Sequence, residues 1–422
     1  MKPNTFRSLR SRNLRLYFAG QALSLLGTWM QKAAVSWVVY SLTHSKLLLG
    51  VSVFAALFPA AVFSLVGGGV ADRYNRYRVL LTTQVLSMAQ AALLALTVYL
   101  WPGNVWGIIG LSAVLGVIDG FDVPARQSLV HQLVADEQDV PNALALNSSL
   151  VNLSKLIGPA VAGFAIERIG ATACFGLNAL SFGAVIGSLL ALRLPAYEVT
   201  PRKKNILGEL REGLHYLRAT PHLRFVVLML ALVSLLALPF TTLMPVYAKD
   251  LFHGTATTFG LLDGAIGAGA FVGALYLASR PPGTNLNRVL MRSMFVFGAG
   301  LVLFSHAPYF WLAQLFVALG AFGMMAQVTL SNTLLQTTAR PDMRGRVISF
   351  FVLAYTAMVP LGSLLVGWAS QHLGVQNAVL GQGLAALLLG GLHWRELHNQ
   401  PVVPTALPLQ ATSTQGLELS SG

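Results

Sequence analysis

A short charged segment separates two long apolar runs in the first quarter of the chain. It reads G-x-x-x-D-R-x-N-R-x-R and joins the run 47–71 to another that begins at residue 79. A carboxylate where a helix leaves a bilayer can accept hydrogen bonds from an opposing helix N-terminus, or pair with an arginine. Such a contact can form in one conformation and break in another. We therefore interpret this segment, with a distant arginine as partner, as a gating motif: Gly68, Asp72, Arg73, Arg76, Arg78 and Arg126.

The arginines of this segment have a second interpretation. Basic residues beside a membrane span also hold that end of the span in the cytoplasm, and Arg76 and Arg78 fit either role. Asp72 adds nothing to an orientation signal, which favours gating for this carboxylate. Asn75 between the arginines tolerates the left-handed backbone that such a turn can need.

Two lysines lie inside apolar runs, where a charge is costly. A lysine in a bilayer costs ~2.5–3.5 kcal/mol and must face a cavity or a partner. Polar side chains share a helix face with each of these lysines at helical spacing. The predicted cavity and substrate residues are Gln21, Thr28, Gln31, Lys32, Asn152 and Lys155. The alternative is that each lysine pairs with a carboxylate or with backbone carbonyls and only ties helices together.

Few carboxylates lie within the runs. Asp119 and Asp122 stand near the end of the fourth run, and Asp263 stands in the eighth. These three are the candidates for carrying a proton, with Asp119 preferred. Two lysines facing one cavity would favour anionic or polarisable ligands, and a nearby tryptophan such as Trp29 would offer a stacking surface.

The elements that position these residues are membrane helices. Of the 422 residues 55% are hydrophobic and only 10% charged, with a mean hydropathy of +0.64, which indicates an integral membrane protein. The runs are too long for barrel strands, so we expect an all-α fold. Twelve spans are predicted at roughly 16–42, 47–71, 79–101, 105–124, 142–167, 172–194, 223–248, 257–279, 287–306, 309–332, 346–370 and 375–394.

Positive charge orients the predicted bundle. If the N-terminus is cytoplasmic, 23 of the 28 Lys and Arg residues fall on the cytoplasmic side. Both termini are then cytoplasmic, and the net charge of +13 is explained by topology and by anionic lipid headgroups. Nucleic-acid binding is not needed to account for it, and none is expected.

The chain divides into two halves. Gly158, Gly163, Ala165 and Gly170 recur 204 positions later as Gly362, Gly367, Ala369 and Gly374, and Leu14-Arg15 recurs as Leu223-Arg224. Small residues also recur in unrelated membrane helices, but these matches coincide with a polar segment at the midpoint, so we infer a tandem duplication. The predicted units are a six-helix bundle at 1–194, a cytoplasmic linker at 195–221, a second bundle at 222–395 and a disordered cytoplasmic tail at 396–422.

The fifth predicted span carries a helix-bend motif. Pro159 removes a hydrogen bond from the helix ladder, while Gly158 and Gly163 allow a neighbouring helix to approach closely. The motif either provides a bending point that shapes the cavity or only permits tight packing.

Twelve spans in two sets of six, with this charged turn between spans two and three, resemble the major facilitator superfamily. Segments 27–31, 71–73, 121–127 and 142–148 are similar to the bacterial subgroup that contains the enterobactin exporter and related efflux proteins. Residues Ser154, Gly158, Pro159, Ala162 and Gly163 resemble the exporter motif of the fifth span, with Ser154 and Ala162 replacing glycines. Asn75 likewise stands where the family usually has glycine.

The resemblance implies the major facilitator fold in the bacterial inner membrane. It implies a monomeric secondary transporter that exports a small amphipathic molecule, a siderophore or a drug, by alternating access with proton antiport, and that can confer multidrug resistance. The partners are then the small-molecule substrate, protons and membrane lipids. A nutrient importer or facilitator, or a non-transporting sensor or lipid scramblase on the same scaffold, remains an alternative.

Enzymatic motifs are missing from the sequence. No lysine follows a glycine, so the chain has no phosphate-binding P-loop, and the motifs H-E-x-x-H and G-x-S-x-G are absent. We therefore expect no enzyme activity, no cofactor and no metal site.

Overall fold

The computed structural model describes residues 6–134, 136–193, 206–281 and 283–399, and within these ranges every regular element is a helix. The predicted tail at 396–422 lies almost entirely outside the described residues, as does the first part of the predicted linker. The side chain of Asp72 is also outside the described set.

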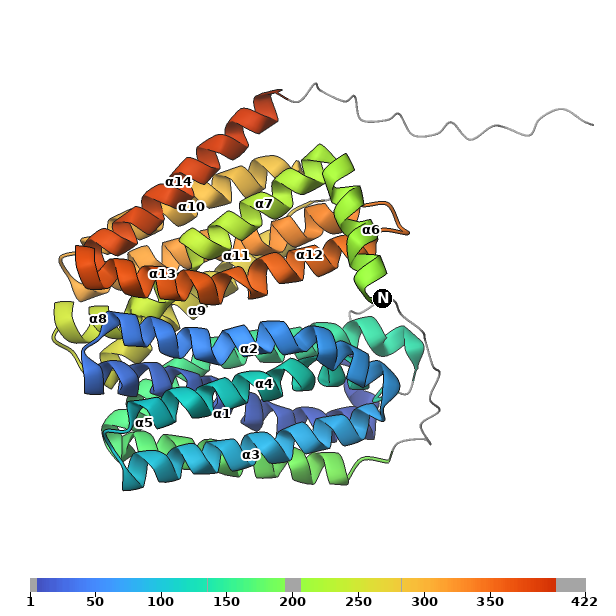
Figure 1. The fold of residues 1–422 in the computed structure, drawn as a ribbon. Helices are drawn as coiled ribbons and strands as arrows, with labels where there is room; N and C mark the ends of the chain where they lie inside the picture. Colours follow the sequence, from blue (N-terminus) through green and yellow to red (C-terminus); the bar gives the residue numbers. More distant parts are fainter. Residues whose placement is uncertain (1–5, 135, 194–205, 282, 400–422) are drawn as a thin grey trace, which may run out of the picture.

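The first five long helices lie side by side in the lower half of Figure 1. Serine and asparagine side chains fix four of their starts, because each accepts a hydrogen bond from a backbone N–H of the first turn. Asn75 is one of these caps, with φ −61°, so this turn does not use the left-handed backbone that asparagine tolerates. The elements are η1 (Arg7–Arg10), α1 (Arg12–Thr43), α2 (Lys46–Arg73), α3 (Arg76–Leu100), α4 (Val105–Val130), η2 (Glu137–Asp139) and α5 (Val140–Leu190).

The remaining helices form the upper half of Figure 1, with α6 lying across their ends at the right. α6 contacts α12 through an ion pair between Arg346 and Glu212, 2.9 Å apart. The elements are α6 (Ile206–Ala219), α7 (Pro221–Leu236), η3 (Leu238–Leu243), α8 (Met244–Val246), η4 (Tyr247–Leu251), α9 (Ala256–Ala278), α10 (Leu286–Ser305), α11 (Phe310–Thr338), α12 (Arg344–Thr356), α13 (Met358–Leu373) and α14 (Val375–Asn399).

The observed boundaries differ from the predicted spans in three places. α5 covers two predicted spans, which meet at Gly170 with φ 84°, a backbone conformation that glycine adopts without strain. The predicted span 223–248 is broken into α7, η3, α8 and η4, where Pro239 and Pro245 each lack an N–H for the helix ladder. The predicted span 346–370 is interrupted at Ala357 between α12 and α13.

Ten helical segments in the described ranges are long and apolar enough to cross a membrane. α1 is not among them, and the segment that contains α5 is counted once despite its turn at Gly170. The chain is therefore a multi-pass membrane protein of helices.

The sequence repeat has a structural counterpart. Gly170 and Gly374 both have positive φ, 84° and 85°, at the ends of helices that also carry Gly163 and Gly367. A Cβ built on Gly163 would lie 3.0 Å from Gly260 Cα, and one on Gly367 would lie 3.1 Å from Gly50 Cα. α5 thus crosses α9 closely, as α13 crosses α2.

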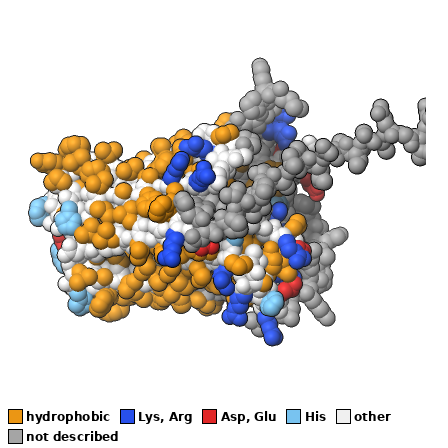
Figure 2. Space-filling model, turned by 90° about the horizontal axis from the view of Figure 1, so that it is seen from above, with side chains coloured by type: hydrophobic (Ala, Val, Ile, Leu, Met, Phe, Trp, Pro, Cys, Tyr) orange, Lys and Arg blue, Asp and Glu red, His pale blue; other side chains and the backbone are white. Residues whose placement is uncertain are grey.

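The two ends of the helical bundle differ in charge. We call them the Arg76 end, where α2 meets α3 and the first helix begins, and the His44 end, where α1 meets α2. Figure 2 shows Lys and Arg side chains from the middle of the molecule to the right, toward the Arg76 end, while most of the visible His side chains lie at the left, beside a largely hydrophobic surface. This asymmetry matches the predicted clustering of basic residues on one side.

Candidate functional site

A cavity of about 330 Å³ lies between the first five helices and the C-terminal elements. Four of the first five helices line one wall, and η3, α9 and α11 line the other. Its charged lining residues come from α1, α5 and α9, and most of the remaining wall is apolar. The lining residues are Trp29, Gln31, Lys32, Ala33, Val35, Ser36, Ser52, Val53, Ala56, Leu57, Ser112, Leu115, Lys155, Pro159, Thr241, Thr242, Phe259, Asp263, Ile266, Gly267, Ala270 and Met324.

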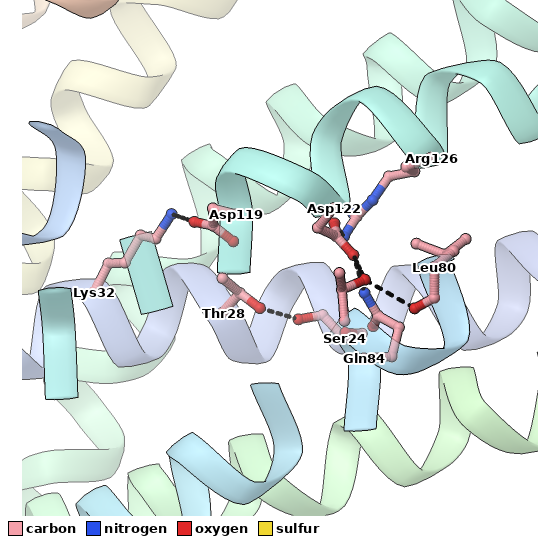
Figure 3. A network of polar contacts seen from close by, with 9 residues as sticks. Ser24, Thr28, Lys32, Leu80, Gln84, Asp119, Asp122 and Arg126 are labelled. Atoms are coloured by element: carbon pink, nitrogen blue, oxygen red, sulfur yellow. Dashed lines mark hydrogen bonds and ion pairs between the residues drawn. The ribbon is translucent and has the colours of Figure 1, made fainter. Parts of the chain in front are cut away.

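Lys32 forms an ion pair across two helices. Its Nζ lies 3.0 Å from Asp119 Oδ2 on α4, and the two side chains are only 27% and 22% exposed (Figure 3). The predicted proton carrier and one predicted cavity lysine are therefore partners. A carboxylate beside the ammonium offsets much of the cost of holding the charge within the helices.

Trp29 lies between the two predicted cavity lysines. Lys32 Nζ is 5.4 Å and Lys155 Nζ 5.1 Å from its ring centroid, distances at which a cation is attracted to the indole face. Within the described residues Lys155 has no ion pair and no hydrogen bond from its ammonium group. Asp263, on the facing wall, likewise has no ion pair or side-chain hydrogen bond in the described part of the chain, so the cavity holds one unpaired basic and one unpaired acidic side chain.

Asp122 does not face the cavity and is 2% exposed. Its carboxylate accepts hydrogen bonds from Thr83 at 2.8 Å and Gln84 at 2.6 Å, and it forms an ion pair with Arg126 one helical turn away (Figure 3). Arg126, which we considered as the partner of Asp72, is thus paired with Asp122 in this conformation. This network joins α3 to α4.

The other predicted polar residues of α1 and α5 have separate environments. Gln31 lines the cavity and accepts a hydrogen bond from Asn178 at 2.7 Å, while Thr28 donates to Ser24 O at 2.8 Å. Gln21 is fully buried, with neither amide atom bonded, and Asn152 is exposed. These last two, and Thr28, are not part of the cavity wall.

The helix-bend motif lies beside the cavity. Pro159 contributes to the wall, and Gly158 packs against α1, where an added Cβ would lie 2.6 Å from Trp29 Cβ. Gly163 lies one turn further along, at the crossing with α9. The motif therefore sets both the position of Trp29 and the contact between α5 and α9.

The predicted gating segment lies at the Arg76 end, away from the cavity lining. Arg73 and Arg78 are exposed, and Arg76 Nε donates to Ala71 O at 3.4 Å, which satisfies a carbonyl in the last turn of α2. Gly68 has open space where a side chain would be.

A set of contacts at the His44 end was missed by sequence reasoning. Tyr40 of α1 donates a hydrogen bond to Asp250 of η4, and Lys249 Nζ donates to Ser41 O at 3.3 Å. Thr255 donates to Glu167 at 2.7 Å, and the backbone N–H of Lys46 donates to the Gln371 side chain at 3.0 Å. With the glycine crossings, these contacts hold the two halves of the chain together at this end.

Comparison with known proteins places the chain in a family. Residues 4–406 match the profile of the transmembrane secretion effector family. The chain is 24% identical to the staphyloferrin A transporter of Staphylococcus aureus, over 89% of this chain and 94% of the relative. It is 24% identical to macrolide efflux protein A of Streptococcus pyogenes, over 87% and 91%.

The fold is also that of solved transporters. A crystal structure of the nucleoside transporter NupG superposes with a TM-score of 0.74 over 92% of this chain and 100% of the other, at 10% identity. The family and these relatives are membrane transporters and not enzymes, in agreement with the sequence prediction. The chain therefore belongs to the transmembrane secretion effector family, within the major facilitator superfamily that its sequence resembles.

Proposed function

We propose that this protein is a secondary transporter that exports a small amphipathic molecule, a siderophore or a drug, from the cytoplasm. The observation that carries the proposal is a cavity with unpaired ionisable side chains, which lies between the two halves of the chain, beside the contacts that join these halves at the His44 end. The names of the relatives, a siderophore transporter and a macrolide efflux protein, support this substrate range.

The proposed architecture has twelve spans in two six-helix bundles, 1–194 and 222–395. The division of α5 at Gly170 supports a count of two spans there, and the matching glycine crossings support two equivalent halves. We place the Arg76 end in the cytoplasm, with both termini, and the protein in the inner membrane of a bacterium as a monomer. The concentration of Lys and Arg at that end supports this orientation.

Transport would proceed by alternating access, with the two bundles rocking about the cavity. Closure at the His44 end then corresponds to a state open toward the cytoplasm. In the opposite state the Arg76 end closes, and we propose that Asp72 forms its latch there. Asp72→Asn should lower turnover without lowering the melting temperature, whereas Asp136→Asn, on an exposed loop, should change neither.

We further propose that a proton drives export in exchange for the substrate. Antiport requires that proton and substrate compete, and a carboxylate in the cavity provides such competition. Asp263 has no partner among the described residues, whereas Asp119 is already paired with Lys32. Asp263 is therefore the better candidate, although the sequence favoured Asp119. Asp122 is fully engaged with Thr83, Gln84 and Arg126 and is the weakest of the three.

The test is efflux from cells that lack their own pumps, followed by assays in proteoliposomes with an imposed pH gradient. A panel of dyes, macrolides and catecholate siderophores is loaded, and efflux is compared with and without the gradient. Export of at least one compound that stops when the gradient is collapsed is the expected result. Net accumulation inside cells would instead indicate an importer, and proton-independent movement of lipid would indicate a scramblase.

A further inference from the structure

The unpaired charges of the cavity belong to different halves of the chain. Lys155 is on α5, and Asp263 is on α9, which packs directly against α5 where Leu156 meets Gly267 and Pro159 meets Gly260. Both side chains line the same cavity, yet they are not within ion-pair distance of each other. The space between them is open for a ligand.

Each charge needs a partner that the described residues do not supply. A lone ammonium or carboxylate is unfavourable in a mostly apolar cavity between membrane-spanning helices, although Lys155 is exposed and Asp263 partly exposed there. Lys32 shows the contrast, because its charge is matched by Asp119. The Trp29 ring attracts the Lys155 ammonium but cannot neutralise it.

Resting on the proposed export function, we propose that the substrate is amphoteric: an anionic group binds Lys155, a cationic group binds Asp263, and an apolar body lies against Trp29 and Phe259. A purely anionic substrate would leave Asp263 unpaired and would be repelled by it. A purely cationic substrate would leave Lys155 unpaired and would be repelled by that ammonium group. Only a molecule with both charges can pair with Lys155 and with Asp263 at the same time.

This arrangement also gives the ligand a mechanical role. Because Lys155 and Asp263 lie in different halves, a ligand bound to both connects the halves by two charge-assisted hydrogen bonds. A proton on Asp263 would remove one of these connections and favour release of the ligand's cationic group. The same residue would then serve binding and exchange.

Three fluorescent probes with one fluorophore test the charge requirement. Nε-dansyl-lysine carries an amine and a carboxylate, dansylcadaverine only the amine, and dansyl-aminohexanoate only the carboxylate. Binding to the purified full-length protein is followed by the rise in dansyl emission in an apolar site. We expect Nε-dansyl-lysine to bind at least about tenfold more tightly than either single-charge probe, since each charged hydrogen bond contributes to affinity.

Variants assign the two charges. Lys155→Gln should reduce the affinity for Nε-dansyl-lysine to that for dansylcadaverine, and Asp263→Asn should reduce it to that for dansyl-aminohexanoate. Arg168→Gln is the matched control, because Arg168 lies on the same helix as Lys155 and over an aromatic ring, 5.3 Å from the Phe164 centroid, but is exposed and not in the cavity wall. It should leave all three affinities unchanged.

Melting temperatures measured for every variant identify any that misfold. Lys155→Arg keeps the positive charge and should retain the preference of the native protein for Nε-dansyl-lysine.

Two results would overturn the proposal: no preference of the native protein for Nε-dansyl-lysine, including no binding of it, or an unchanged preference in a folded Lys155→Gln protein. These results are separable from failure of the export function. Gradient-driven efflux of any compound without this charge preference would uphold export and reject the amphoteric site. A clear charge preference without gradient-driven efflux would uphold the amphoteric site and reject the export function.

Discussion

Gly163 of α5 and Gly260 of α9 touch backbone to backbone: a Cβ on Gly260 would lie 3.1 Å from Gly163 Cα. Gly367 of α13 and Gly50 of α2 form the equivalent crossing in the other pair of helices. Four glycines thus allow the halves to close against each other at the His44 end, and a side chain at any of them would push the helices apart.

Gly163→Val should disfavour the closed state of this end. Overpacking a tight contact costs ~1–3 kcal/mol, which would shift a two-state equilibrium about five- to 150-fold toward opening there. The change is measured as the labelling rate of a cysteine in the cavity, such as Ser36→Cys, by a membrane-impermeant thiol reagent added from the His44 side.

The chain offers a control on the same element. A Cβ added at Gly176 of α5 would have no atom within 4 Å, so Gly176→Val should leave the labelling rate unchanged. Equal rates in the Gly163 and Gly176 variants would show that the crossing does not control closure.

The Lys32–Asp119 pair predicts a double-mutant result. Asp119→Asn leaves the ammonium unmatched and should destabilise the protein by ~1–3 kcal/mol, below the ~3–5 kcal/mol of a fully buried pair because both side chains are partly exposed. Removing both charges, with Lys32→Met and Asp119→Leu, should restore much of that loss. Thermal unfolding of the purified protein measures both effects.

The exposed pair Arg340–Asp342 sets the scale for this comparison. Its side chains are 65% and 54% exposed, so Asp342→Asn should leave the melting temperature unchanged, because solvent screens the pair. If Asp119→Asn also left the melting temperature unchanged, the Lys32–Asp119 ion pair would contribute nothing measurable to the stability of the protein.

The sequence predicted the helical fold well because hydrophobic length alone identifies membrane segments. Of the six predicted cavity residues, Lys32, Gln31 and Lys155 line the cavity of the structure. A charge inside an apolar run has few tolerable positions, but the role of these residues in substrate binding stays a prediction. The breaks near Pro239 and at Ala357 were not predicted, because apolar composition does not distinguish a straight helix from a broken one.

Contacts between distant segments were harder to anticipate. Tyr40 and Asp250 are 210 residues apart, and neither stands in a recognisable motif. The glycine crossings carried one weak signal: Gly50 and Gly260 are also separated by 210 positions, close to the offset of the Leu14-Arg15 repeat. The partner of Lys32 was ambiguous from sequence because several carboxylates were within reach of the first span.

Gly170 predicts a backbone effect that is independent of packing. Its φ of 84° is strained for any residue with a Cβ, and no neighbour lies within 4 Å of that position. Gly170→Ala should therefore cost ~1 kcal/mol or more from backbone strain alone. Gly176→Ala, in a helical backbone with equal space, should instead be neutral or stabilising, because alanine favours the helix. The melting temperature of Gly170→Ala should therefore be lower than that of Gly176→Ala, and equal melting temperatures would contradict the assignment of strain to Gly170.

Tyr40 predicts how strongly a single hydrogen bond holds the His44 end closed. Its hydroxyl connects α1 to Asp250 of η4, across the two halves, and a hydrogen bond to a charged group contributes ~1.5–3 kcal/mol. Tyr40→Phe removes only that bond, so the population open at this end should rise about tenfold or more.

The labelling rate of Ser36→Cys from the His44 side measures this rise. The native Cys174 adds little background because it is buried. Tyr99→Phe, at an exposed tyrosine of α3, is the matched control. Labelling as slow in Tyr40→Phe as in Tyr99→Phe would mean that the other contacts at this end hold it closed without the Tyr40 hydrogen bond.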